Sequence, residues 1–274
     1  MKIAWCTDIH LNFVTSPSDF GRKISGVDPD AVLITGDISE CYRLSRDLLS
    51  LRDGIGDKIP IWFVLGNHDS YQGSVTQAKN IAGKMSGLAS NLIYIGNEEH
   101  KCIEIVKDTW LIGVDGWYSA TAGIPFESEI QLSDFSLVSE MVITKMRDQR
   151  DMTAGRVAAA RRLASTEAEL AKVKLTAVLK KNPKKVIVAT HVPPYVLSCF
   201  HEGKISDENW LPWFTNTLLG DVLDSVAKNN PKVLFDVFCG HTHSSGIYHR
   251  SDNVTVTVGA ARYVIPSIAA VMEF

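Results

Sequence analysis

Short apolar runs alternate with amphipathic stretches over the first ninety residues. The runs at 2–6, 31–34 and 61–65 have the length and composition of buried strands. The stretch 43–51 places apolar residues at helical spacing, and 75–85 is predicted as a second helix. Strands that alternate with helices at such short intervals indicate βαβ units and an α/β fold.

The middle of the chain changes this rhythm. Three strands are predicted in succession at 92–95, 102–106 and 110–114, with turns at 97–100 and 107–108. No helix is predicted between these strands, so this part of the sheet is expected to be antiparallel or mixed.

A mainly helical insertion is predicted around residues 119–182. Residues 133–150 are predicted to be helical, and 153–181 is rich in Ala, Leu, Glu, Lys and Arg, which favours one long helix. Asn182-Pro183 then ends that helix. Its basic residues either form a solvated face or bind phosphate groups.

The C-terminal part returns to strands. A loop at 195–213 carries His201, Glu202, Trp210 and Trp213, and it either overhangs a site or packs on the surface. We found no linker, repeat or low-complexity segment, so a single domain over residues 1–274 is expected. Strands are predicted at 186–189, 233–239, 254–258 and 268–274.

Net charge and hydrophobic content indicate which classes of binding partner to expect. The hydrophobic content of 45% and charged content of 22% are those of ordinary globular proteins. A net charge of −3 provides no global attraction to nucleic acid or to anionic membranes, and no apolar run is long enough to span a membrane. Neither partner is therefore expected, and the oligomeric state is left open.

Cysteine usage and the N-terminus indicate the compartment. The chain has 5 cysteines, an odd number, and none forms a CxxC pair. Buried free thiols in a reducing environment are expected. The N-terminus leads directly into a strand without a signal-peptide core, so a cytoplasmic location is predicted.

Side chains that can bind metals follow five of the strand-like runs. In an extended chain, residues i and i+2 point the same way, so Asp8 and His10 can address one point. Each of these short motifs, taken alone, also fits a polar turn. Gly66-Asn67-His68-Asp69, for example, has ordinary turn residues. Metal-binding side chains occur at the carboxyl ends of five predicted strands. Open α/β sheets bind ligands at those ends, so the five together predict a ligand site. The side chains are Asp8 and His10, Asp37, Asn67 and His68, His191, and His241 and His243.

The types of ligand indicate the kind of metal. Imidazole nitrogens mixed with carboxylate and amide oxygens suit Mn, Fe, Zn, Ni or Co better than Ca or Mg. The set is larger than one ion needs. Two ions about 3.5–4 Å apart, bridged by a carboxylate, would use all of these ligands.

The order of these blocks resembles that of the calcineurin-like metallophosphoesterases. The resemblance spans residues 8–243 and implies the metallo-dependent phosphatase fold, a four-layer α-β-β-α sandwich of two mixed sheets flanked by helices. The matching blocks are Asp8-x-His10, Gly36-Asp37-x-x-Glu40, Gly66-Asn67-His68-Asp69, His191 and Gly240-His241-x-His243.

The resemblance also implies a dinuclear metal site with Asp37 as the bridging ligand. Mn, Fe or Zn are the expected ions, with Ni or Co also suitable. One ion would be held by Asp8, His10, Asp37 and His243, and the other by Asp37, Asn67, His191 and His241.

The implied reaction is attack of a metal-bridging hydroxide on a phosphoester. His68 would be a catalytic residue outside the ligand set, acting as general acid, with Glu40 behind it to orient the ring. Asn67 would bind a metal through its amide oxygen and phosphate through its nitrogen. Asp69 would cap the following helix.

The substrate class follows from departures within the blocks. Cys41 follows Glu40 where phosphoprotein phosphatases of this superfamily carry arginine, and the third block ends in Asp69 rather than glutamate. The resemblance therefore points to the bacterial-type branch, acting on small phosphodiesters or nucleotides, including cyclic ones. The alternatives are a DNA or RNA nuclease of the same superfamily and a non-catalytic interaction scaffold. Specificity is expected from the loops at 11–25, 116–150 and 195–214.

Overall fold

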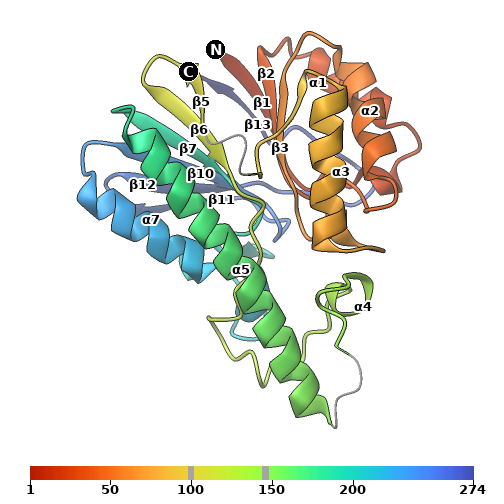
Figure 1. The fold of residues 1–274 in the computed structure, drawn as a ribbon, viewed down its shortest axis with the longest axis vertical. Helices are drawn as coiled ribbons and strands as arrows, with labels where there is room; N and C mark the ends of the chain where they lie inside the picture. Colours follow the sequence, from red (N-terminus) through yellow and green to blue (C-terminus); the bar gives the residue numbers. More distant parts are fainter. Residues whose placement is uncertain (98–101, 144–147) are drawn as a thin grey trace.

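The computed structural model describes residues 1–97, 102–143 and 148–274. Within these residues, two large mixed sheets pack face to face, and helices cover the outer face of each (Figure 1). The α-β-β-α sandwich implied by the resemblance is therefore confirmed.

The first sheet has the strand order β13-β1-β2-β3-β4. Its strands β1 to β4 run parallel, and β13 joins β1 antiparallel. The strands are β1 (Lys2–Cys6), β2 (Ala31–Thr35), β3 (Ile61–Val64), β4 (Leu92–Tyr94) and β13 (Ala270–Glu273).

The second sheet has the order β11-β12-β10-β7-β6-β5. The inner four strands are parallel, and β11 and β5 pair antiparallel at the two edges. Its strands are β5 (Ile103–Val106), β6 (Thr109–Gly113), β7 (Lys185–Ala189), β10 (Leu234–Cys239), β11 (Gly246–Ser251) and β12 (Val254–Val258). A separate hairpin is formed by β8 (Phe200–His201) and β9 (Lys204–Ile205).

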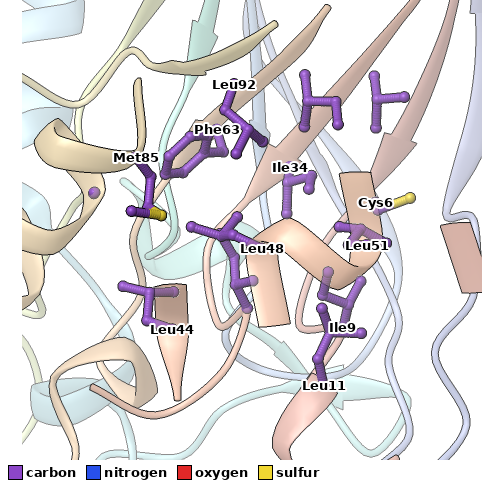
Figure 2. Packing of buried hydrophobic residues seen from close by; sticks show 14 of the residues in the cluster. Cys6, Ile9, Leu11, Ile34, Leu44, Leu48, Leu51, Phe63, Met85 and Leu92 are labelled. Carbon is purple, nitrogen blue, oxygen red and sulfur yellow. The ribbon is translucent and has the colours of Figure 1, made fainter. Parts of the chain in front are cut away.

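Three helices, α1 (Pro17–Ser25), α2 (Leu44–Ile55) and α3 (Val75–Leu88), cover the outer face of the first sheet. Figure 2 shows Ile34 and Phe63 of that sheet in one buried cluster with Leu48 and Met85 of the helices. The opposite faces of the same strands pack against the second sheet. Burial on both faces is why these strands are continuous apolar runs in the sequence.

The outer face of the second sheet is covered by α7 (Thr217–Asn229) and the C-terminal half of α5 (Gln149–Leu179). The N-terminal half of α5 extends past the sheet (Figure 1) and shares a buried cluster with α4 (Asp134–Leu137) and α6 (Leu211–Phe214). Short 3-10 turns are η1 (Leu11–Phe13), η2 (His68–Ser70) and η3 (Val196–Ser198). In the described part of the chain, no helix combines the length and apolar character needed to cross a membrane.

The helix predicted at 133–150 is wrong. Its start forms the short α4, but the segment at 138–143 is not helical, and α5 begins at Gln149. Tertiary hydrogen bonds explain the break, because Leu137 O accepts from Gln72 N at 2.9 Å and Ser139 N donates to Gly73 O at 2.9 Å. Residues 144–147 of this helix and 98–100 of the predicted turn lie outside the described residues. The pattern also missed α1, α7 and β11.

Asp69 does not cap the following helix, contrary to the prediction. Ser74 caps α3 by accepting from Gln77 N at 3.0 Å. The buried Asp69 carboxylate instead accepts from the N–H groups of Ile38, Ser39 and Gly66 at 2.9, 2.8 and 2.8 Å. It therefore ties the loop after β2 to the loop after β3.

Replacing Asp69 should destabilise the fold. Asp69→Ala leaves three backbone donors without their acceptor, so the free energy of unfolding should fall by about 3 kcal/mol. Urea denaturation of the metal-free protein measures this loss. The exposed Asp57 provides the control, and Asp57→Ala should stay within about 0.5 kcal/mol of wild type. Equal stability of the two variants would contradict the role given to Asp69.

Candidate metal centre

The predicted ligands converge where the strand ends of the two sheets meet. Asp8 N donates to Gly36 O at 3.1 Å and His10 N donates to Asp37 O at 2.9 Å, so the loops after β1 and β2 are fixed to each other. The Nδ1–H of His191, after β7, donates to Thr35 O of the first sheet at 2.9 Å. One group of side chains is thus assembled from both sheets.

Asp8, His10, Asp37 and His243 form a cluster that could hold a metal ion. One possible ligand atom from each lies within 4.8 Å of the others. The Nε2 atoms of His10 and His243 are 3.1 Å apart, and His243 Nε2 lies 3.4 Å from Asp8 Oδ1. These are the four residues predicted for the first ion.

The residues predicted for the second ion form a neighbouring cluster. Asn67 Oδ1 lies 3.1 Å from both His191 Nε2 and His241 Nδ1, and these nitrogens are 3.3 Å apart. Asp37 Oδ1 is 3.3 Å from His191 Nε2, whereas its Oδ2 faces His10 Nε2 at 3.9 Å. Asp37 therefore contributes one oxygen to each cluster, as a bridging ligand must.

The hydrogen bonds of the two histidines in the second cluster favour a bound cation. His191 Nδ1–H is used by Thr35 O, and His241 Nε2–H is used by Trp213 O at 2.9 Å. The remaining nitrogens both face Asn67 Oδ1, so the lone pairs of three atoms converge once His191 Nε2 is deprotonated. Ions bound at about 2.0–2.2 Å place their ligands roughly 3 to 3.5 Å apart, which matches this spacing.

Burial and neighbouring charges together set the protonation states of the site. Burial lowers the pKa of His10 to about 3, and burial together with His191 lowers the pKa of His241 to about 4, so both rings are neutral near pH 7. Burial opposes ionisation of Asp37, but His191 and His68 outweigh it and hold the Asp37 pKa well below the usual value. His191 is likewise buried, yet Asp37 raises its pKa to about 10. The site thus favours a positive charge next to Asp37.

Several ligands have strained backbones. Non-glycine residues with positive φ cost about 1–3 kcal/mol each and gather at functional sites. The residues are Asp8, His10, Asp37, His241 and His243, with φ of 49°, 41°, 50°, 71° and 56°. All five of these residues lie in the loops that directly follow β1, β2 and β10.

Gly66 permits close approach of the two loops. A Cβ at this position would overlap Asp37 Oδ1 and lie 2.8 Å from Cδ2 of His191. The residue at the start of Gly66-Asn67-His68-Asp69 is therefore needed for space beside the bridging carboxylate, since its φ is not among the positive ones.

A cavity of ≈ 330 Å³ opens above the two clusters. Asp37, Asn67 and His68 line it, as does the segment at 131–134. His201, Trp210 and Phe214 form one wall, so the loop at 195–213 overhangs the site. Tyr263 also lines the cavity, with its ring centroid 4.5 Å from that of His10 and 4.8 Å from that of His243. A larger cavity of ≈ 970 Å³ between α3 and α5 contains none of the predicted ligands.

His68 and Glu40, predicted to act together, are not joined by a hydrogen bond in the described residues. His68 lines the cavity, with Nε2 3.8 Å from Asp37 Oδ2, and its ring stacks on Tyr71 at 4.2 Å between centroids. Glu40 Oε1 accepts from Asn12 Nδ2 at 3.2 Å. The role of Glu40 stays a prediction.

The Asn67 nitrogen makes hydrogen bonds within the protein. Nδ2 donates to Asp134 Oδ2 at 3.2 Å and lies 3.5 Å from Tyr71 Oη, so it is already engaged without phosphate. Sequence reasoning missed Asp134, Tyr71, Tyr118 and Tyr263 around this site. None belongs to a strand-end block, and no sequence signal brings them there.

Fold and ligand set together define a metallo-dependent phosphatase. The calcineurin-like phosphoesterase family model matches residues 1–245, and the chain belongs to this family. The predicted enzyme class, a metal-dependent phosphoric ester hydrolase, is confirmed at that level. No curated protein matches the chain in sequence.

Solved structures share the fold at low sequence identity. A dimetal phosphatase from Danio rerio is 13% identical with a TM-score of 0.54, over 95% of this chain and 87% of that one. The phosphopantetheinyl hydrolase PptH from Mycobacterium tuberculosis is 12% identical with a TM-score of 0.59, over 96% and 90%. A protein from Thermus thermophilus is 14% identical with a TM-score of 0.53, over 94% and 88%.

A methyl group at position 66 should prevent metal loading. Gly66→Ala places Cβ against the Asp37 carboxylate, so the purified protein should lose most of its bound metal, as measured by elemental analysis. Gly83 in α3 is the control, because nothing lies within 4 Å of a Cβ there. Gly83→Ala should keep the metal and stabilise the helix by about 0.5–1 kcal/mol. Full metal content in Gly66→Ala would contradict the steric argument.

Proposed function

We propose that this protein hydrolyses small phosphodiesters or nucleotides, including cyclic nucleotides, with two transition-metal ions. Mn, Fe or Zn are the proposed ions, and Ni or Co also suit the ligands. The observation that supports this most is the pair of ligand clusters sharing Asp37 at the floor of a cavity. A cytoplasmic location stays a prediction.

The cavity favours a small substrate. Its volume of ≈ 330 Å³ lies at the lower end of the usual range for small-molecule sites. Among the described residues, no lysine or arginine lines it, while Tyr71, Trp210, Phe214 and Tyr263 provide aromatic walls. A single phosphoryl group attached to an uncharged organic group fits these walls. A nucleic-acid strand would need cations along its backbone, which argues against the nuclease alternative.

The proposed chemistry divides between the ions and the protein. When bound, the ions supply charge neutralisation at the phosphoryl group and make water more acidic. Asp37 and Asn67 Oδ1 would be among the ligands that hold these ions. His68 lies beside Asp37 and faces the cavity, where it can donate a proton to the leaving-group oxygen.

A substrate panel tests the function. Metal-free protein would be reloaded separately with Mn, Fe, Zn, Ni and Co. We expect metal-dependent turnover of bis(p-nitrophenyl) phosphate, and of at least one cyclic nucleotide or nucleoside monophosphate. Cleavage of single-stranded DNA with a salt-dependent gel shift would favour the nuclease. Absence of both metal binding and turnover would favour the non-catalytic scaffold.

Removing the His68 imidazole should separate metal binding from proton transfer. His68→Ala should keep its metal content but lose about 100- to 10,000-fold in kcat on alkyl phosphoesters. The loss should be much smaller for p-nitrophenyl esters, because p-nitrophenolate leaves without protonation. His249→Ala, on the exposed part of β11, is the control and should match wild type. Equal losses on both ester types would argue against general acid catalysis.

A further inference from the structure

A carboxylate outside the predicted ligand set is buried against the metal centre. Asp134 opens the short helix α4 and has an exposed fraction of 1%. Its Oδ2 accepts from Asn67 Nδ2 at 3.2 Å and from Tyr71 Oη at 2.7 Å, and its Oδ1 accepts from Tyr118 Oη at 3.1 Å. Three side chains therefore converge on one acidic group.

Each of these three side chains contacts a predicted site residue or is one. Asn67 directs Oδ1 at His191 and His241. The Tyr71 ring stacks on His68 with an interplanar angle of 24°. The Tyr118 ring stacks near His241, with centroids 6.1 Å apart. Asp134 thus connects to both the ligands of one ion and the proposed acid.

We propose that Asp134 is the positioning residue of this centre, which orients the Asn67 amide and, through Tyr71, the His68 ring. The inference rests on the proposed function, because it concerns the same site. An amide can present either its oxygen or its nitrogen to the ions. The Asp134 carboxyl oxygens accept from both tyrosine hydroxyls and from Asn67 Nδ2, so Asp134 takes up the nitrogen end of the amide and leaves Oδ1 for the metal.

The segment that carries Asp134 is fixed to the loop that carries Asn67. Leu137 O accepts from Gln72 N, and Ser139 N donates to Gly73 O. These hydrogen bonds form an isolated β-bridge between Gly73 and Val138. Glu140 accepts from Val75 N at 3.0 Å at the start of α3. The insertion is therefore part of the metal centre as well as a cover over it.

Tyr71 also accounts for the orientation of His68 better than Glu40 does. In the described residues, His68 stacks on Tyr71, whereas the Glu40 carboxylate is bonded to Asn12. The Tyr71 route predicts that removing the Tyr71 hydroxyl lowers kcat.

The first test measures metal affinity without catalysis. Mn²⁺ would be titrated calorimetrically into metal-free Asp134→Asn, whose new amide can turn a donor toward Asn67. We expect the affinity of one of the two sites to fall about 10- to 100-fold, with the other unchanged. Asp224→Asn is the matched control, because Asp224 also accepts from a tyrosine, Tyr195, at 2.9 Å. Wild-type affinities at both sites of Asp134→Asn would overturn the proposal.

The second test measures kcat at saturating metal. Tyr71→Phe keeps the ring against His68 but removes the hydroxyl that joins it to Asp134. We expect kcat to fall about tenfold or more with little change in KM. Tyr195→Phe, which removes a tyrosine hydroxyl that donates to Asp224, is the matched control and should stay near wild type. A wild-type kcat in Tyr71→Phe would overturn the Tyr71 route. If Asp134→Asn does not fold, Tyr71→Phe and the corresponding Tyr118→Phe provide the test.

Failure of this inference is distinguishable from failure of the proposed function. Two-site metal binding by wild type without turnover of any substrate would reject the function and leave the affinity test intact. Turnover by wild type together with unchanged affinities in Asp134→Asn would reject the positioning role alone.

Discussion

The centre depends on bringing lone-pair atoms from two sheets close together around the Asp37 carboxylate, whose oxygens lie 3.3 Å from His191 Nε2 and 3.9 Å from His10 Nε2. Such atoms repel one another unless a cation lies between them. In the protein without ions, the pKa of His191 is raised and that of Asp37 is lowered, so the site favours a positive charge at this point. The rest of the structure supplies the means to hold these atoms in place.

The supporting interactions are of several kinds. The two sheets pack through Trp5, Leu33, Leu111 and Ile187, which fixes the strand ends relative to each other. Asp69 joins the loop after β2 to the loop after β3 by hydrogen bonds. Gly66 leaves room for the Asp37 carboxylate. The strained ligand backbones persist because these surroundings determine them.

The mainly helical segment between β6 and β7 supports the residues that surround the metal centre. The N-terminal half of α5 builds a separate buried cluster with α4 and α6, and this cluster places Asp134 beneath Asn67 and Tyr71. Trp210, just before α6, and Phe214, at the end of α6, line the cavity. A segment that is hard to interpret in the sequence thus shapes the surroundings of the metal ligands.

By itself the sequence determined most strands of the two large sheets, the α/β class and the candidate ligands at five strand ends. This was possible because buried strands are continuous apolar runs, and because ligands follow them directly, as Asp37 follows β2. The tertiary structure alone decided the roles of Asp69 and Asp134 and the break after α4. Those outcomes depend on hydrogen bonds between segments up to 67 residues apart, such as Asn67 to Asp134, and local periodicity carries no information about such pairings.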